Sequence, residues 1–382
     1  MKLLFTGDIN FRGFSELNLQ MCDDILVEIL PYFESVDFRI VNLETPLADK
    51  EKHTPIKKSG PNLICAPSNI LLLETLNIDV CTLANNHIGD YGEGAVVDTL
   101  KNLTGNGIRY CGAGENLESA YDAVRLERDG LSVSVISVCE NEFGMATEEV
   151  AGSAGYNPRL LINKIKEEKK KSKFVVVVFH GGNEFNPLPS PDTQDRYRLI
   201  CDMGADAVIA GHTHCPQGYE IYDGKPIIYS MGNFLFKSSS ERSANDSWYY
   251  GYMTELDIDE SGIVFCTIPY KFNSEATRIT VFEGDEKRKM LRYIDSLSEI
   301  IKDPKLLDNY FSGWAYLHKW VPQAPSNYFD LKEYNSSGNY NLISCESHLS
   351  QAKKVLEFCF LDRVAEAKEW SEKVAELTRM PV

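Results

Sequence analysis

The chain has 382 residues, of which 43% are hydrophobic and 25% are charged, and its formal net charge is −17 at pH 7. This composition is typical of a globular protein with a large core. The acidic excess argues against a protein that binds nucleic acid, because such binding relies on clustered Lys and Arg. No segment reaches the roughly 18 consecutive apolar residues that span a membrane, and the first residues turn polar too early for a secretory signal. We therefore expect a cytoplasmic protein without a transmembrane segment.

Short strands and helices alternate along the first two thirds of the chain. Continuous Val, Ile and Leu runs predict strands buried on both faces, at residues 2–6, 38–42, 79–84, 132–138, 174–180, 207–210 and 227–231. Helical patterns lie between them, at residues 23–32, 69–76, 94–105, 158–171 and 193–203. This alternation indicates an α/β domain with a largely parallel core.

The last third of the chain has a different pattern. Strands are expected at 252–258 and 263–270, where they flank a turn and predict a hairpin. Beyond Glu283 the pattern becomes helical, and helices are expected at 285–302 and 347–377. We therefore divide the chain into an α/β domain over residues 1–282 and a helical C-terminal region over residues 283–382.

Polar side chains gather where the predicted strands end. Binding sites of open α/β sheets lie outside the carboxyl ends of the strands. The polar residues at those ends are Asp8, Asn10, Glu44, Asn86, His87, His180, His212 and His214. Imidazole, carboxylate and amide groups together suit ions such as Mn, Fe, Co or Zn. The set is large enough for two ions.

The tetrapeptide Gly211-His212-Thr213-His214 is the strongest of these signals, because both imidazoles follow one apolar run. One metal ion would use one of them, and a metal pair could use both. Adjacent residues that leave a strand tend to face opposite ways. Asn86 can therefore bind metal while His87 faces the substrate as a proton donor.

Five short motifs together resemble those of the calcineurin-like metallophosphoesterase superfamily, and most closely its CapA branch of bacterial capsule and poly-γ-glutamate biosynthesis proteins. The motifs are Gly7-Asp8, Asn42-Leu43-Glu44, Ala84-Asn85-Asn86-His87, His180-Gly181-Gly182-Asn183-Glu184 and Gly211-His212-Thr213-His214. The segment at residues 229–234 is similar to the closing signature of that family. The resemblance extends over residues 1–270, and it rests on the order and spacing of the motifs.

The resemblance implies a four-layered α/β/β/α metallophosphoesterase-like sandwich and a centre of two divalent transition-metal ions, Mn, Fe or Zn. Asp8 and His214 would hold one ion. The other ion would be held by Asn86, His180 and His212. Glu44 would bridge the two ions, and His87 would protonate the leaving group. The residues expected to contact the substrate are Asn10, Asn42, Asn141, Glu142 and Glu184. Asn141 and Glu142 are included because they follow the strand at 132–138, and an ordinary polar loop is an equal alternative for them.

The resemblance also implies an activity, that of a metal-dependent hydrolase of the phosphoesterase type. Such an enzyme would act in capsule or poly-γ-glutamate biosynthesis, on an anionic small molecule or polymer. Two alternatives stay open. The same site could cut a γ-glutamyl amide, or the protein could be a non-catalytic assembly or export factor for an anionic capsule polymer, alongside other capsule-biosynthesis proteins.

The remaining candidates have less informative surroundings. Lys58, in a basic loop, could meet an anionic substrate, but a solvated loop is the favoured interpretation. His53, His318 and His348 do not follow a strand, which predicts surface or packing roles. Trp314 in the helical region could cover the α/β domain or dock a partner, and core packing is the favoured interpretation.

Overall fold

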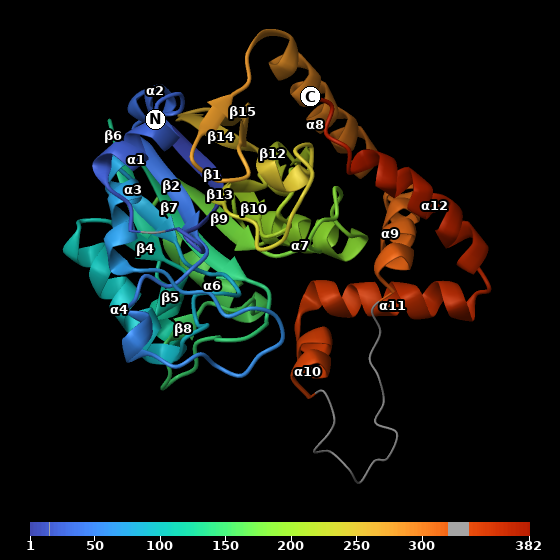
Figure 1. Ribbon diagram of the computed structural model, residues 1–382, viewed down its shortest axis with the longest axis horizontal. Coiled ribbons are helices and arrows are strands. Elements are labelled where there is room, and N and C mark those ends of the chain that lie inside the picture. Colours follow the sequence, from blue (N-terminus) through green and yellow to red (C-terminus); the bar gives the residue numbers. More distant parts are fainter. Residues whose placement is uncertain (15, 320–335) are drawn as a thin grey trace.

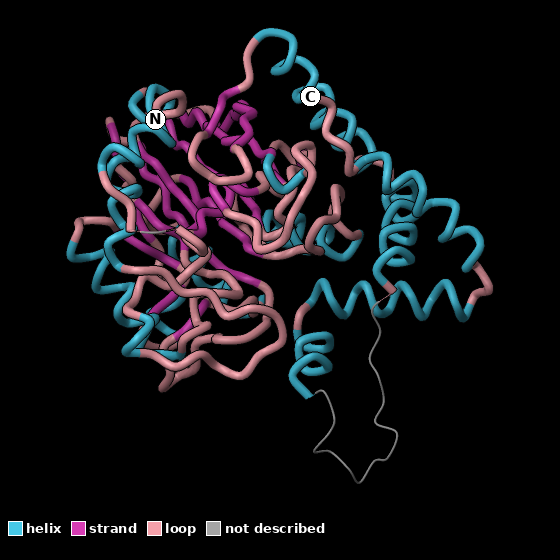
Figure 2. Tube along the Cα trace, viewed as in Figure 1, coloured by secondary structure: helices cyan, strands magenta, loops and turns pink. Residues whose placement is uncertain are grey.

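The computed structural model describes residues 1–14, 16–319 and 336–382, and strands form its centre with helices around them (Figures 1 and 2). An eight-stranded sheet has the order β16-β15-β14-β1-β2-β3-β4, with β13 paired to β1. Its strands are β1 (Lys2–Asn10), β2 (Phe38–Leu43), β3 (Val80–Thr82), β4 (Arg109–Cys111), β13 (Asn233–Phe236), β14 (Tyr250–Asp259), β15 (Gly262–Phe272) and β16 (Ile279–Val281).

A second sheet of six strands has the order β11-β12-β10-β9-β7-β6. Its strands are β6 (Val124–Arg128), β7 (Leu131–Cys139), β9 (Phe174–His180), β10 (Ala207–Gly211), β11 (Tyr219–Tyr222) and β12 (Lys225–Ile228). The short strands β5 (Ala113–Gly114) and β8 (Gly152–Ser153) form a separate pair. The central strands β7, β9 and β10 are parallel, as the sequence predicts.

Helices cover the outer faces of the two sheets. The first group is α1 (Leu19–Leu26), α2 (Leu30–Glu34), α3 (Leu71–Thr75) and α4 (Gly92–Gly105), and the second group is α5 (Leu117–Ala120), α6 (Pro158–Glu168) and α7 (Pro191–Asp202). The helices α6 and α7 each begin at a proline after a capping Asn or Ser, which fixes where they start.

The strand β9 shows how the layers pack, because its residues alternate between two cores. Val176 belongs to a core that also holds residues of the first sheet and of helices α1, α3 and α4. Val175 and Val177 belong to a core shared with Leu161 of α6 and Ile200 of α7. The layers are therefore helices, sheet, sheet and helices, and the predicted four-layered α/β/β/α architecture is confirmed.

The C-terminal helices are α8 (Gly284–Ile301), α9 (Pro304–His318), α10 (Ser336–Ser344), α11 (Glu346–Phe360) and α12 (Val364–Leu377), and they lie along one side of the sandwich (Figure 1). The helix α8 contacts β11 and β15, whereas α9 and α11 contact α7. The helical character of this region is confirmed, and the division of the chain near residue 283 stays a prediction. Among the described residues, none of the helices has both the length and the apolar character needed to cross a membrane.

Two segments that were each predicted to form one helix are each divided in the structure, so these two predictions are wrong. The helix expected at 23–32 ends at Leu26, and α2 begins at Leu30 with a proline in its first turn. The helix expected at 347–377 is interrupted between α11 and α12, where Asp362 has a φ of 55°. A left-handed residue cannot continue a right-handed helix, so the chain turns there.

Candidate metal centre

Parallel pairing brings the polar strand ends to one edge of the sandwich. In the first sheet, Asp8 pairs with Asn42 and with Asn233. In the second sheet, His180 pairs with Cys139 and with Gly211, the residue before His212. Because parallel strands in register end at the same level, the residues that follow them meet in one place.

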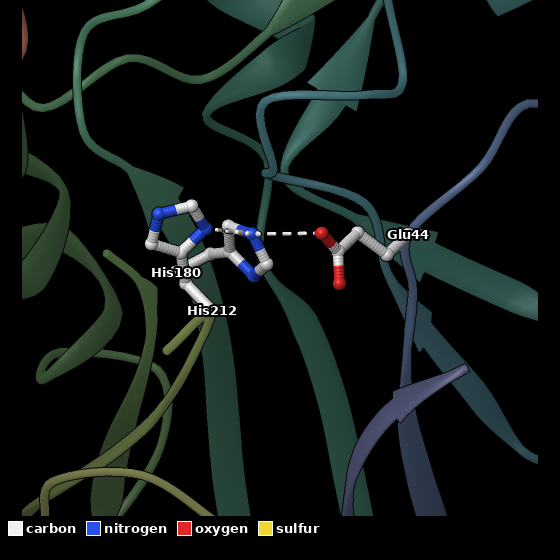
Figure 3. A group of neighbouring side chains, drawn as sticks. All are labelled: Glu44, His180 and His212. Atoms are coloured by element: carbon white, nitrogen blue, oxygen red, sulfur yellow. Dashed lines mark hydrogen bonds and ion pairs between the residues drawn. The ribbon is translucent and has the colours of Figure 1, made fainter. Parts of the chain in front are cut away.

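The first group of candidate ligands is Glu44, His180 and His212 (Figure 3). One ligand atom from each residue lies within 4.8 Å of the others, and all three residues are buried. His180 Nε2 lies 3.7 Å from Glu44 Oε1 and 3.0 Å from His212 Nδ1. The amide oxygen of Asn86 lies 3.1 Å from His180 Nε2, so Asn86 also borders this group.

The second group is Asp8, Glu44 and His214, which meet the same 4.8 Å limit. His214 Nε2 lies 3.9 Å from Glu44 Oε1, and His214 Nδ1 lies 4.0 Å from Asp8 Oδ2. Glu44 belongs to both groups, which is the position that a bridging carboxylate needs. Five of the six residues predicted as metal ligands therefore fall into these two groups, and Asn86 borders the first; their roles as ligands stay a prediction.

The carboxylate of Glu44 is buried beside imidazoles but receives no hydrogen bond from the described residues. Both of its oxygens are buried without a hydrogen-bond partner in the part of the chain that the structure describes. Burial raises the pKa of Glu44 well above its usual value, and the negative charges of Asp8 and Glu184 add to this. Two buried carboxylates beside three imidazoles form a donor set that a divalent cation would satisfy. The residues present therefore fit a metal centre.

Two of the imidazoles, those of His180 and His214, are in the form that binds metal. Burial lowers the pKa of His180 well below its usual value, and the neighbouring His212 and His214 lower it further. Burial also lowers the pKa of His214, although nearby carboxylates oppose the shift. These two rings are therefore neutral near pH 7 and can offer a lone pair to an ion.

Hydrogen bonds from surrounding residues fix the orientation of the candidate ligands. Asn42 Nδ2 donates to Asp8 Oδ1 at 2.7 Å and lies 3.1 Å from His180 Nδ1. His214 Nδ1 lies 2.9 Å from Asn233 Oδ1. Such contacts set the ring orientation at metal sites. The sequence analysis missed Asn233, although it lies within the closing motif of the family.

The backbone around the two histidines is strained. His212 and His214 have φ values of 96° and 56°, a region that residues other than glycine rarely adopt. A Cβ atom on Gly211 would lie 2.9 Å from Asp8 Oδ1, so a larger residue there would displace that carboxylate. Strain of this kind costs about 1–3 kcal/mol for each residue and clusters at functional sites.

His87 is held by a buried carboxylate. Its Nδ1 lies 2.7 Å from Asp90 Oδ2, while its Nε2 lies 3.9 Å from Glu44 Oε1. Burial lowers the pKa of His87, and the positive charge of Lys58 adds to this effect. Asp90 is a second residue that the sequence analysis missed. Its position three residues after His87, in one turn, was the available signal.

The position of Lys58 agrees neither with the predicted contact to a substrate nor with the favoured solvated loop. Its side chain is 4% exposed and forms an ion pair with Asp90, which is fully buried. Its Nζ also donates to the backbone oxygen of Asn86 at 3.3 Å. Lys58 is therefore not part of a solvated loop. Its charge is already paired, so it is not available to neutralise a substrate. The exposed neighbour Lys57 fits the solvated interpretation.

The buried pair leads to a stability prediction. Lys58→Met is expected to lower the free energy of unfolding by about 3 kcal/mol, because breaking a buried ion pair leaves the other charge uncompensated. Urea denaturation of the metal-free protein measures this value. Lys57→Met is the matched control and should change it by less than about 0.5 kcal/mol. Equal effects of the two substitutions would show that the pair with Asp90 contributes nothing.

A cavity of about 490 Å³ opens beside this centre. Asn86, His87, Glu142 and Glu184 line it, so two of the five predicted substrate contacts face the cavity. The amides of the other three are used inside the protein. Asn10 donates to the backbone oxygen of Glu44 at 2.6 Å, Asn42 donates to Asp8, and Asn141 donates to Glu346 at 2.6 Å.

The C-terminal helices supply the opposite wall of the cavity. Trp314 is buried, in agreement with the packing interpretation, and it also lines the cavity. His318 and His348 line the cavity as well, so their assignment to the surface or to packing is incomplete. His53 pairs with Asp98 away from this site. Sequence reasoning could not find the wall, because these histidines are far along the chain from the motifs.

A family model described as bacterial capsule synthesis protein PGA_cap matches residues 2–238. The capsule biosynthesis protein CapA of Bacillus anthracis is 30% identical over 257 residues, which are 65% of this chain and 62% of that protein. The PGA biosynthesis protein CapA of Bacillus subtilis (strain 168) is 28% identical over 256 residues, 64% of this chain and 65% of that protein. The chain thus spans less than two thirds of the length of these relatives. A solved structure of a hypothetical protein from Thermus thermophilus is 17% identical, with a TM-score of 0.44 over 72% of this chain and 99% of that chain.

Proposed function

The chain belongs to the bacterial capsule synthesis protein family, and on this premise we propose that it is a metal-dependent hydrolase of the phosphoesterase type that acts in capsule or poly-γ-glutamate biosynthesis. The observation that carries the proposal is Glu44, a buried carboxylate without a hydrogen-bond partner among the described residues, which belongs to both groups of candidate ligands. A buried charge of this kind is unfavourable unless a cation compensates it.

The cofactors of the proposed enzyme are two divalent transition-metal ions, Mn, Fe or Zn. Asp8, Glu44 and His214 would hold one ion, and Glu44, His180 and His212 would hold the other with the help of Asn86. When bound, such ions acidify water and neutralise charge that develops on phosphoryl oxygens. The proposed substrate accordingly presents an anionic or polarised group at this centre.

His87 is the proposed proton donor to the leaving group. A carboxylate can only accept a hydrogen bond, so the Asp90 carboxylate accepts from His87 Nδ1–H. In the imidazolium form, which the Asp90 carboxylate favours against the effect of burial and Lys58, the transferable proton is at Nε2, on the side that faces Glu44 and the cavity. Lys58 holds the other oxygen of Asp90 and keeps the ring in this orientation. These contacts position His87 to protonate a leaving group.

A second candidate function follows from the names of the Bacillus relatives, which state biosynthesis and no hydrolysis. The protein would then be an assembly or export factor for an anionic capsule polymer, acting with other proteins of that process, and its metal site would bind without cutting. A γ-glutamyl amide substrate stays within the hydrolase proposal, because the same groups could act on an amide carbonyl. A cytoplasmic location likewise stays a prediction.

Metal content and stability test the centre. We expect the purified chain to bind about two manganese ions, and saturating manganese to raise the free energy of unfolding by about 3 kcal/mol, since the unfolded chain cannot assemble the ligand set. Metal analysis and urea denaturation measure both quantities. Calcium, which prefers sites made of oxygen ligands, is the control ion and should stabilise the protein much less. If manganese neither binds nor stabilises the protein, the dinuclear centre is excluded.

Turnover separates the enzyme from the assembly factor. The panel consists of p-nitrophenyl phosphate, bis(p-nitrophenyl) phosphate and γ-glutamyl-p-nitroanilide. An enzyme should turn over at least one of them with manganese and stop when a chelator is added. Inactivity on all three, together with binding of poly-γ-glutamate that survives the chelator, would favour the assembly factor.

A further inference from the structure

The helices α9, α10 and α11 are part of the cavity beside the candidate metal centre, although they lie beyond the segment that the family model matches. They contribute Trp314, His318, Asn341, His348 and Gln351 to its wall. Side chains at the start of α11 fix this wall to the metal edge. Ser347 Oγ donates to Glu140 Oε1 at 2.6 Å, and Glu346 Oε2 accepts from the backbone of Asn141 at 2.9 Å.

The residues that line the cavity include hydrogen-bond acceptors without a partner. Asn183 and Asn341 are 3% and 5% exposed, and both line the cavity. Their Nδ2 groups are occupied, because Asn183 donates to Ser347 O at 3.1 Å and Asn341 donates to Glu142 Oε2 at 3.2 Å. Their Oδ1 atoms are buried and find no partner in the described ranges of the chain. Each amide is thus held with an acceptor left over, which a donor on a ligand would satisfy.

The side of the cavity next to the metal centre carries negative charge. Glu142 and Glu184 line the cavity, and Lys58, which also borders it, is ion-paired with Asp90. Away from the candidate ligands, the cavity therefore favours a positive group and opposes a second negative one.

The wall also contains one unused donor. The indole Nε1 of Trp314 is buried and has no hydrogen-bond partner within the described parts of the chain. It could donate to a hydroxyl or carbonyl oxygen on the ligand. Among the described residues that line the cavity, the acceptors of Asn183 and Asn341, the donor of Trp314 and the hydroxyl of Ser59 are thus without a partner, beside two carboxylates.

We propose that the outer cavity is a subsite for a primary ammonium group of the substrate, formed by Glu142, Asn183, Asn341 and Glu184. This inference rests on the proposed function, in which the anionic or polarised group of the substrate lies at the metal centre. An ammonium group has three donors and no acceptor, which matches the acceptors of this wall. A chain of carboxylates would instead place its charges against Glu142 and Glu184. The substrate inferred for the hydrolase is therefore an ester or amide that bears a primary amine.

Three phosphonates that cannot be hydrolysed test this subsite by calorimetry on the manganese-loaded full chain. The probes 3-aminopropylphosphonate, butylphosphonate and 4-phosphonobutyrate share a three-carbon spacer and end in an ammonium, a methyl or a carboxylate group. We expect the ammonium probe to bind about tenfold more tightly than the methyl probe, the effect of one charge-assisted hydrogen bond, and the carboxylate probe to bind most weakly.

Substitutions identify the groups responsible. In the double variant Glu142→Gln/Glu184→Gln, which keeps the side-chain shapes, the preference for the ammonium probe should fall to less than about threefold, because charge-assisted bonds become neutral ones. The exposed pair Glu148→Gln/Glu149→Gln, which makes the same charge change outside the cavity, is the control and should keep the preference. A preference lost equally in both variants would overturn the subsite, since the effect would be long-range.

The outcomes also separate the subsite from the proposed function. If 4-phosphonobutyrate binds as tightly as the ammonium probe or more tightly, the ammonium subsite is wrong, while phosphonate binding at the metal centre still supports the hydrolase. If no probe binds and no substrate of the chromogenic panel is turned over with manganese, the proposed function is wrong and the subsite is wrong with it.

Discussion

Glu44→Gln is expected to remove both metal ions and all metal-dependent turnover, because Glu44 is the one residue common to the two ligand groups found in the described chain. A neutral amide is a weaker ligand than a carboxylate and cannot compensate two cations. The variant should therefore lose the stabilisation of about 3 kcal/mol that saturating manganese gives the wild type. Metal analysis, turnover and urea denaturation with and without manganese measure these effects.

The same substitution should change the pH dependence of the metal-free protein. The folded-state pKa of Glu44 is raised above its usual value of 4.5 by burial and by Asp8. The stability that protonated Glu44 contributes is thus fully present below pH 4.5 and is lost as the pH rises through the folded-state pKa. Wild type should lose stability in that window relative to Glu44→Gln, which cannot ionise. Parallel stability curves for the two proteins would contradict this interpretation of the site.

Glu220 provides the matched control for Glu44. It is also a buried carboxylate, but Arg198 donates to both of its oxygens at 2.9 and 2.7 Å, and Tyr229 donates to one at 2.5 Å. Glu220→Gln should therefore lower the free energy of unfolding by about 3 kcal/mol, as breaking a buried pair does, and leave the metal content unchanged. The two variants would then separate a carboxylate that binds metal from one that stabilises the fold.

The sequence predicted the centre of the fold because its signals there are local. The strand at 174–180 has the same bounds in the structure, since a run of four valines between polar segments has few other conformations. The candidate ligands lie near the carboxyl ends of such strands, so their meeting at one edge required only that the strands be parallel. The helix α9 also had a local signal, Asp303 before Pro304, which caps and begins it.

The remaining parts depend on contacts between distant residues. Asn10 and Asn42 lie at strand ends, as do the candidate ligands, but their amides turn toward Glu44 and Asp8. The sequence could not distinguish an amide that faces substrate from one that orients a ligand. The pair formed by Lys58 and Asp90 spans 32 residues, and the wall of C-terminal helices is more distant still. Neither arrangement has a periodicity that a sequence could display.

His87→Ala is expected to slow turnover by about 10²- to 10⁴-fold, the usual contribution of a positioned general acid. The loss should be largest for substrates with poor leaving groups, because p-nitrophenolate leaves readily without a proton. Metal content should stay near that of the wild type, since His87 belongs to neither ligand group. Steady-state rates on a pair of esters that differ only in the leaving group, together with metal analysis, measure these effects.

His212→Ala is the comparison for this variant, and it should lose metal and activity together because His212 belongs to the first ligand group. Asp90→Asn should lie between them. It keeps the metal but weakens the orientation of the His87 ring, so its rate should fall by less than that of His87→Ala and fall most on the poor leaving group. If His87→Ala empties the centre instead, the division of roles between Asn86 and His87 is wrong, and His87 is itself a ligand. If it leaves the poor leaving group unaffected, the proton comes from another donor.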